Sequence, residues 1–265
     1  PEQYLSGISR AVRHSVPPPI AMILCYPANP TAQVVGLDFY KDAVALAKKH
    51  NLLILSDMAY SEIYFDEANP PPSVLQVDGA KDIAVEVNTL SKTYSMAGFR
   101  VGFALGNARV IAALARVKSY LDYGAYTPIQ VAAAAALNGP QDCVAEMRAI
   151  YKARRDALVD SFAKAGWPLE EPKASMFAWT AIPEKFRHLG SVEFSKQLLE
   201  KAGVAVAPGA GFGEYGDGHV RIALVENEQR IRQAARAVRR FLNGEEREQT
   251  AVSTKATGTP NLAAE

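Results

Sequence analysis

The sequence predicts an α/β fold, in which a mostly parallel sheet has helices on both faces, followed by a smaller α+β C-terminal domain. In the first half, short apolar runs alternate with stretches that have helical spacing. The runs at 21–26, 52–55 and 83–90 are continuous rather than alternating, as in strands that are buried on both faces. After the long helical stretch that begins at 142, shorter strand and helix patterns follow, which is typical of an α+β arrangement.

Each predicted element has a local signal. A further strand is expected at 101–105, and three more at 175–182, 204–207 and 219–225. Helices are expected at 37–51, 107–123, 127–136, 142–165, 191–202 and from Asn227 to near Gly244. Thr127-Pro128, Ser191 and Asn227 are predicted helix starts, and Gly139-Pro140 and Gly166 are predicted stops. We therefore expect a large domain at 1–145, a small domain at 146–244 and a disordered polar tail at 245–265.

The composition excludes several classes of function. With 29 basic and 28 acidic residues, the net charge of +1 gives no electrostatic case for binding nucleic acid or membrane. No apolar stretch is long enough to span a bilayer. Cys25, Cys143 and the four histidines have no metal-binding spacing, so no metal site is expected. Two unpaired thiols indicate a reducing compartment and predict a cytoplasmic location.

Polar side chains follow the first three apolar runs, where each predicted strand ends. Asn29 follows the first run, Asp57 and Tyr60 follow the second, and Lys92 follows the third. In doubly wound sheets, ligands bind at the carboxyl ends of the strands, so these side chains are expected at one edge. Taken singly, an Asp after a strand is more often a helix cap and a Lys is more often a solvated surface residue. The coincidence of all four favours a site.

These residues also carry a resemblance to a known family. The segments 29–31 (Asn-Pro-Thr), 57–60 (Asp-x-x-Tyr), 91–92 (Ser-Lys) and 98–102 (Gly-Phe-Arg-Val-Gly) resemble the fold-type I pyridoxal-phosphate-dependent aminotransferases of classes I and II. The wider sequence, through 90–94, 173–176 and 208–213, is similar to bacterial glutamate–pyruvate (alanine-forming) aminotransferases. The resemblance covers roughly residues 1–243.

The resemblance implies pyridoxal 5'-phosphate as the cofactor, together with the residues that act on its ring. Lys92 would form the Schiff base with the cofactor aldehyde, for which its amine must be unprotonated, and would then shuttle a proton. Asp57 would pair with the pyridine nitrogen and keep the ring an effective electron sink. Asn29 and Tyr60 would hydrogen-bond the phenolic oxygen of the ring. Asp57, Tyr60 and Lys92 are thus the expected catalytic residues.

The resemblance assigns the cofactor phosphate to a second set of residues. Arg100, eight positions after Lys92, would clamp the phosphate, because a guanidinium fork suits phosphate geometry. Thr89 and Ser91 would donate hydroxyl hydrogen bonds to it. The alternative for Arg100 is a solvated position at the edge of a strand.

Arg221 is the expected substrate-binding residue, together with Asn29. Alternation in the predicted strand 219–225 puts three apolar residues on one face and leaves Arg221 on the other with Ala223 and Val225. A lone Arg among apolar neighbours needs an anionic partner. The resemblance supplies the substrate α-carboxylate, bound bidentately; the alternative is an internal salt bridge to Asp or Glu.

The resemblance implies amino transfer between an L-amino acid and a 2-oxo acid, with alanine/pyruvate and glutamate/2-oxoglutarate as the expected pairs. Aspartate or LL-diaminopimelate as amino donor stays open, as does a pyridoxal-phosphate-dependent carbon–sulfur lyase. The non-enzymatic alternative is the ligand-sensing domain of a transcription regulator. Family members are homodimers, and they usually carry a stretch before the region that begins here, so we expect a fragment whose cofactor site lacks one wall.

Overall fold

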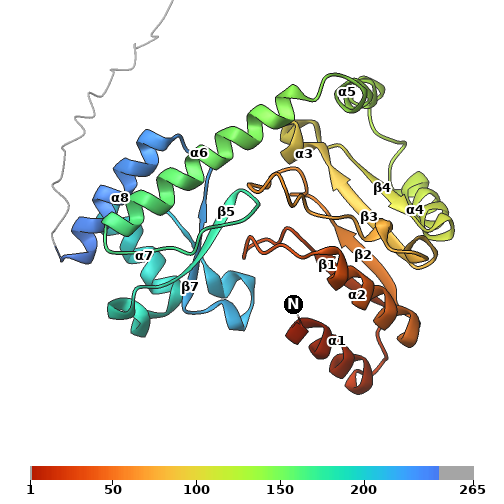
Figure 1. Ribbon diagram of the computed structural model, residues 1–265, viewed down its shortest axis with the longest axis horizontal. Coiled ribbons are helices and arrows are strands. Elements are labelled where there is room, and N and C mark those ends of the chain that lie inside the picture. The colour runs from red at the N-terminus through yellow and green to blue at the C-terminus, as the bar shows by residue number, and fades with distance from the viewer. Residues whose placement is uncertain (1, 245–265) are drawn as a thin grey trace, which may run out of the picture.

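The computed structural model describes residues 2–244 as two sheets, each next to its own hydrophobic core (Figure 1). The first sheet has the order β1 (Ala21–Cys25), β2 (Leu53–Asp57), β3 (Ala84–Thr89) and β4 (Gly102–Gly106). β1, β2 and β3 are parallel, and β4 is antiparallel to β3. The α/β class and the mostly parallel sheet are therefore confirmed.

Helices α1 (Glu2–His14) and α2 (Leu37–His50) pack into the core of the first sheet. Leu24 of β1 and Tyr40 of α2 are both fully buried there. On the opposite face of β1 and β2, the side chains of Ile23, Leu53 and Leu55 are exposed. The sequence predicted helices on both faces of the sheet. Helix α2 covers one face, but no helix within residues 2–244 covers Ile23, Leu53 and Leu55 on the other face. Helix α1 was not predicted from the sequence.

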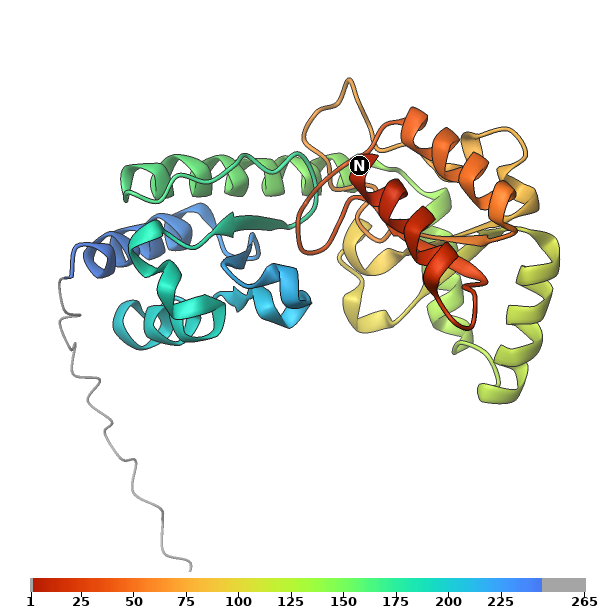
Figure 2. The same cartoon turned by 90° about the horizontal axis from the view of Figure 1, so that it is seen from below.

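The second sheet is antiparallel, with the order β5 (Phe177–Ala181), β7 (His219–Ala223) and β6 (Ala207–Pro208). Helices α6 (Asp142–Lys164), α7 (Gly190–Ala202) and α8 (Glu228–Leu242) contribute to its core. Figure 2 shows α6 and α8 lying side by side next to this sheet, while α6 extends toward the first sheet. The predicted boundary near residue 145 lies in the first turn of α6, and the division into two domains stays a prediction.

Nine further helices lie within residues 2–244. They are η1 (Val74–Gln76), η2 (Ala80–Asp82), α3 (Leu90–Thr93), η3 (Ala97–Phe99), α4 (Ala108–Leu121), α5 (Thr127–Asn138), η4 (Glu184–Leu189), η5 (Gly209–Phe212) and η6 (Glu214–Gly216). None of the helices in the described chain is long and apolar enough to cross a membrane. The tail predicted at 245–265 lies outside the described residues.

Two of the predicted helix caps are corrected. Thr127 is the first residue of α5, and the carbonyl of Tyr126 accepts the first backbone bonds, from Ile129 at 2.9 Å and Gln130 at 3.3 Å. Ser191 lies inside α7, where its backbone N–H donates to Asp217 Oδ1 at 2.7 Å. This bond also lowers the pKa of the Asp217 carboxyl. A carboxylate 26 positions away therefore caps α7, while Asn227 caps α8 as predicted.

The strand predicted at 204–207 is also corrected. Only Ala207 and Pro208 pair with β7, opposite Arg221 and Val220. Pro208 has no N–H to continue the ladder, which restricts it to a short edge strand. The chain turns directly into η5 after it.

Candidate active site

The register of the first sheet brings the predicted site residues to one edge. Cys25, the last residue of β1, pairs with Asp57, the last residue of β2, and Asp57 pairs in turn with Val87 of β3. Asn29 follows β1 by four positions, and Lys92 lies in α3, directly after β3. Parallel pairing thus places the carboxyl ends of three consecutive strands together, as the sequence predicted.

Asp57 is partly buried at this edge. One carboxylate oxygen, Oδ1, accepts a hydrogen bond from the backbone N–H of Ala59 at 3.0 Å, which fixes the side chain at the end of β2. Burial raises the pKa of the neighbouring Cys25 thiol, and the Asp57 carboxylate adds to this rise. Cys25 therefore stays a neutral thiol beside Asp57 at neutral pH. The sequence reading assigned Cys25 no place at the site.

Lys92 and the two predicted hydroxyls lie in one turn. Thr89 caps α3, since its Oγ1 accepts from the backbone N–H of Ser91 at 3.1 Å, and it lies 2.9 Å from Ser91 Oγ. Thr89 Oγ1 also donates to the carbonyl of Val101 at 3.2 Å, which ties this turn to the segment that follows Arg100. Within residues 2–244 the amine of Lys92 has no hydrogen-bond or ion-pair partner.

Arg100 is exposed and has a left-handed backbone, with φ of 53°. This conformation costs a residue other than glycine roughly 1–2 kcal/mol. The guanidinium Nη1 donates to the carbonyl of Ala97 at 3.0 Å, across η3. This contact is compatible both with a solvated position for Arg100 and with a role in binding the cofactor phosphate. The role of Arg100 therefore stays a prediction.

Tyr60 lies between the two sheets. Its ring makes an edge contact with Phe177 of β5, with ring centres 5.7 Å apart. Burial raises the pKa of the Tyr60 phenol, and the positive charge of Arg221 opposes the rise. Tyr60 therefore remains a protonated hydrogen-bond donor at neutral pH.

Arg221 joins the second sheet to the first. In β7 its neighbours Val220 and Ile222 face the core, so Arg221 points away from it, as the alternation predicted. Its Nη1 donates to Asn29 Oδ1 at 2.7 Å, across 192 positions of sequence. Among residues 2–244 no carboxylate lies within ion-pair distance of Arg221, which excludes the internal salt bridge within that range. Its Nε is buried and has no partner there.

Three aromatic residues next to Arg221 were not predicted as site residues. Phe177 and Phe212 both contact its guanidinium, and Trp179 is paired with Arg221 across the β5–β7 ladder. The strand predicted at 175–182 is β5, and alternation within it places Phe177 and Trp179 on the face that they share with Arg221.

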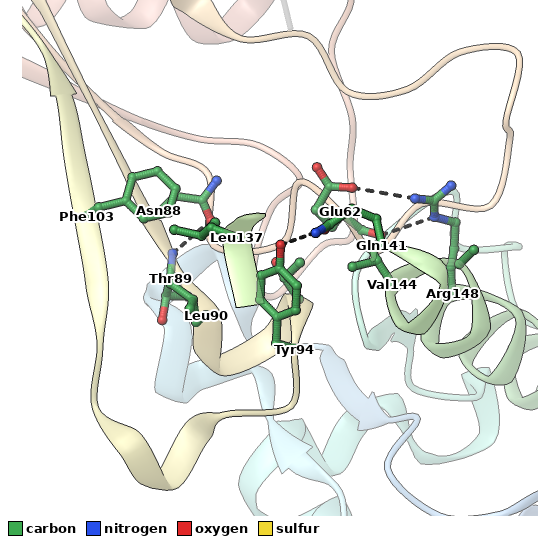
Figure 3. Close-up of a pocket in the computed structure, with 12 residues that line it drawn as sticks. Glu62, Asn88, Thr89, Leu90, Tyr94, Phe103, Leu137, Gln141, Val144 and Arg148 are labelled. Carbon is green, nitrogen blue, oxygen red and sulfur yellow. Dashed lines mark hydrogen bonds and ion pairs between the residues drawn. The ribbon is translucent and has the colours of Figure 1, made fainter. Parts of the chain in front are cut away.

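A cavity of about 350 Å³ adjoins this site without containing it (Figure 3). Its wall includes Thr89, Glu62 and Tyr94, whose hydroxyl donates to Gln141 Oε1 at 2.7 Å. Arg148 also lines the cavity, and its Nη2 lies 3.5 Å from Glu62 Oε2. Of the predicted site residues only Thr89 lines this cavity, so it is not the space between Lys92 and Arg221.

Comparison with known proteins decides the family. The family model for aminotransferase class I and II matches residues 2–238. The chain belongs to this family. The class I and II aminotransferases use pyridoxal 5'-phosphate. Among residues 2–244 no cluster of His, Cys, Asp or Glu could hold a metal ion.

Individual class I and II aminotransferases are similar over most of the chain. AatC of Rhizobium meliloti, described as an aminotransferase, is 67% identical over 91% of the chain and 60% of its own length. The glutamate-pyruvate aminotransferase AlaC of Escherichia coli is 53% identical over 89% of the chain and 57% of its own length. An LL-diaminopimelate aminotransferase of Moorella thermoacetica is 45% identical over 83% of the chain and 56% of its own length. Among solved structures, BacF of Bacillus subtilis superposes with a TM-score of 0.80 at 37% identity, covering 84% of the chain and 56% of BacF.

The chain therefore spans 52–60% of the length of these and similar curated relatives. Its donor set suits the family cofactor in chemical terms. A carboxylate, an amine without a partner among the described residues and a pair of hydroxyls 2.9 Å apart lie at one sheet edge. In chemical terms the carboxylate can pair with a protonated pyridine nitrogen, the amine can react with an aldehyde, and the hydroxyls can donate hydrogen bonds to a phosphate.

Proposed function

We propose that the protein of which this chain forms at least a part transfers an amino group between an L-amino acid and a 2-oxo acid. The observation that carries the proposal is Arg221. Its guanidinium has no carboxylate partner within the described residues, its Nε is buried and unpaired, and Asn29 orients it. A guanidinium without a carboxylate partner can bind a carboxylate through two parallel hydrogen bonds, and every amino acid and 2-oxo acid carries a carboxylate.

The cofactor would be held by residues of both the strand ends and the turn after β3. When bound, pyridoxal phosphate supplies an electrophilic aldehyde and a ring that takes up the electron pair of the substrate carbon. In this proposal Lys92 Nζ moves the proton at the substrate α-carbon, and the Asp57 carboxylate holds a proton at the ring nitrogen. Asn29 and Tyr60 orient the ring through its phenolic oxygen.

The phosphate would be bound by Thr89, Ser91 and Arg100. The two hydroxyls lie close enough to contact neighbouring phosphate oxygens. Arg100 contributes a guanidinium on the segment that Thr89 tethers through Val101. The bond to Ala97 uses Nη1 alone, so the other N–H groups of Arg100 remain as donors for the phosphate.

The proposed substrates are alanine/pyruvate and glutamate/2-oxoglutarate. The support is the higher identity to the glutamate-pyruvate enzyme, 53%, than to LL-diaminopimelate aminotransferases, 44–46%. LL-diaminopimelate is the second candidate donor because several such enzymes are similar to this chain.

The test incubates the protein with pyridoxal phosphate, L-alanine and 2-oxoglutarate. Pyruvate and glutamate are expected in equal amounts, with faster turnover than with LL-diaminopimelate or aspartate as donor. Faster turnover with LL-diaminopimelate would reject the alanine assignment and keep the reaction class. Release of pyruvate, ammonia and thiol from cystathionine, without amino transfer, would identify a lyase instead. Ligand binding without turnover of any of these substrates would favour a sensor.

Replacing Asp57 by asparagine is expected to lower the rate of proton removal by about 10²-fold or more, because the negative charge at the ring nitrogen is lost. Asparagine keeps a side-chain oxygen for the bond from Ala59, so the end of β2 is preserved. The measurement is the single-turnover rate with L-alanine. Asp78→Asn, at an exposed position, is the control and should match the unsubstituted protein. An unchanged rate in Asp57→Asn would remove Asp57 from the proposed site.

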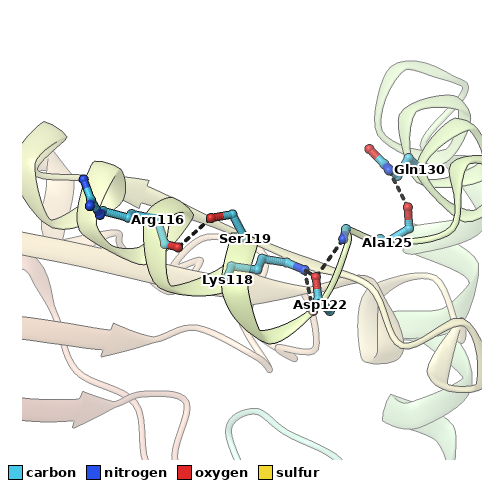
Figure 4. Close-up of polar contacts among 7 residues, drawn as sticks. Arg116, Lys118, Ser119, Asp122, Ala125 and Gln130 are labelled. Atoms are coloured by element: carbon cyan, nitrogen blue, oxygen red, sulfur yellow. Dashed lines mark hydrogen bonds and ion pairs between the residues drawn. The ribbon is translucent and has the colours of Figure 1, made fainter.

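We also propose that two copies associate through the surface between α4 and α5. Tyr120, Leu121, Tyr123 and Tyr126 are all at least 72% exposed, and so many large exposed apolar side chains on one short segment are typical of an interaction surface. Figure 4 shows that polar contacts fix this turn: Lys118 pairs with Asp122. Asp122 Oδ1 also accepts from the backbone N–H of Gly124 at 2.8 Å.

The association is tested by sedimentation equilibrium. The unsubstituted protein is expected to be a dimer, and Tyr123→Asp with Tyr126→Asp to be a monomer, because charges in an apolar interface are costly. Tyr215→Asp is the control, since Tyr215 is 92% exposed on η6 at the second sheet. A dimer that survives the double substitution would place the interface elsewhere.

A further inference from the structure

The guanidinium of Arg221 contacts two aromatic rings. Its Cζ lies 4.1 Å from the ring centre of Phe177 and 4.7 Å from that of Phe212. Both contacts place the cation over a ring face, where the ring quadrupole attracts it. Phe177 is buried in β5, whereas Phe212 is 39% exposed on η5.

Phe212 is itself held in place from two sides. The Trp179 ring meets it edge to face, with ring centres 5.8 Å apart and planes at 87°. Trp179 is fixed in turn by stacking on His219, with ring centres 5.3 Å apart and planes at 5°. The loop that carries Phe212 is closed by Gly209 and Gly216, whose backbones approach so closely that neither position has room for a side chain. The ring that Phe212 presents to Arg221 is therefore part of a fixed assembly.

We propose that Phe212 is a positioning residue of the carboxylate site, acting through Arg221. Phe212 and Phe177 both present a ring face to the guanidinium and Asn29 accepts from Nη1, so the remaining N–H groups are the donors left for a ligand. A carboxylate is planar and pairs edge to edge with this fork. Asn29 holds Nη1 and sets the rotation of the plane, while Phe212 sets its tilt. The inference rests on the proposed function, because it assigns Arg221 to a substrate carboxylate.

The test measures carboxylate binding and turnover in parallel. Calorimetric titration with 2-oxoglutarate, without added cofactor, is expected to give about fivefold to tenfold weaker binding in Phe212→Leu, because Arg221 loses one of the two rings that orient its guanidinium. Phe212→Tyr keeps the ring face and should bind within about twofold of the unsubstituted protein. In turnover, Phe212→Leu should raise KM for both alanine and 2-oxoglutarate by a similar factor and leave kcat unchanged.

Tyr215→Leu is the matched control, because it removes an exposed ring from the same loop region without touching Arg221. It should leave both binding and KM unchanged. The folded state of each variant is checked by its urea unfolding midpoint. If Phe212→Leu fails to fold, Phe212→Met replaces it in the comparison with Phe212→Tyr.

The outcomes separate this inference from the proposed function. If Arg221→Leu abolishes binding while Phe212→Leu binds and turns over normally, the positioning role is rejected and the proposed function stands. If Phe212→Tyr is weakened as much as Phe212→Leu, the ring contact is not the cause and the inference is also rejected. If the unsubstituted protein neither binds 2-oxoglutarate nor transfers an amino group, both are rejected.

Discussion

Replacing Lys92 by alanine is expected to lower amino transfer by about 10⁴-fold or more. The substitution removes the amine that we propose to hold the cofactor aldehyde and to move the α-proton, and proton transfer alone contributes roughly 10²–10⁴-fold. Lys92 follows β3 directly and has no competing partner among residues 2–244. The measurement incubates the protein with pyridoxal phosphate, reduces it with borohydride and locates the labelled lysine by peptide mass.

In the unsubstituted protein the label should concentrate on Lys92, and prior incubation with excess L-alanine followed by washing should remove it. The control is Lys49→Ala, an exposed lysine in the last turn of α2, which should keep both label and activity. Label spread over many lysines, or full activity in Lys92→Ala, would contradict the assignment.

The second large effect is expected from Arg221→Leu. Removing one partner of a charge-assisted pair costs roughly 2–5 kcal/mol, which corresponds to about 30-fold to several thousandfold in KM for both substrates. Arg221→Lys keeps the charge but loses the fork and the bond geometry to Asn29, so its loss should be smaller. Steady-state kinetics with alanine and with 2-oxoglutarate measure the effect.

The control for Arg221 is Arg236→Leu, which removes an exposed guanidinium from α8. It should leave KM unchanged for both substrates. If Arg221→Leu raised KM for only one substrate, the shared carboxylate site would be wrong, and a second cationic group would have to serve the other.

The strand-end part of the site was predictable because it follows from the pattern of strands along the sequence. Continuous apolar runs indicate parallel strands, parallel strands end at one edge, and Asn29, Asp57 and Lys92 follow three such runs. The face of Arg221 followed from alternation with a period of two. The first inference needs the order of three runs along the chain, and the second needs one strand, so both rest on patterns that follow the sequence.

Contacts between distant elements could not be predicted in this way. The bond from Arg221 to Asn29 and the contact of Phe212 with Arg221 depend on how the two sheets and the η5 loop are arranged in space. The same limit explains Ser191, which has the residue type of a helix cap while Asp217 supplies the cap from another segment. A capping residue type indicates a helix start, but tertiary contacts decide which side chain satisfies the N–H groups.

The hydrogen bond between Arg221 and Asn29 also has a thermodynamic consequence. It joins a strand of one hydrophobic core to a loop of the other, so a carboxylate bound by both residues acts as a reversible cross-link between them. A ligand that binds only when the two cores are docked stabilises the docked arrangement, and this stabilisation grows with the logarithm of the free ligand concentration above Kd. If the proposed carboxylate site is correct, substrate concentration is expected to set how strongly the two cores unfold as one cooperative unit.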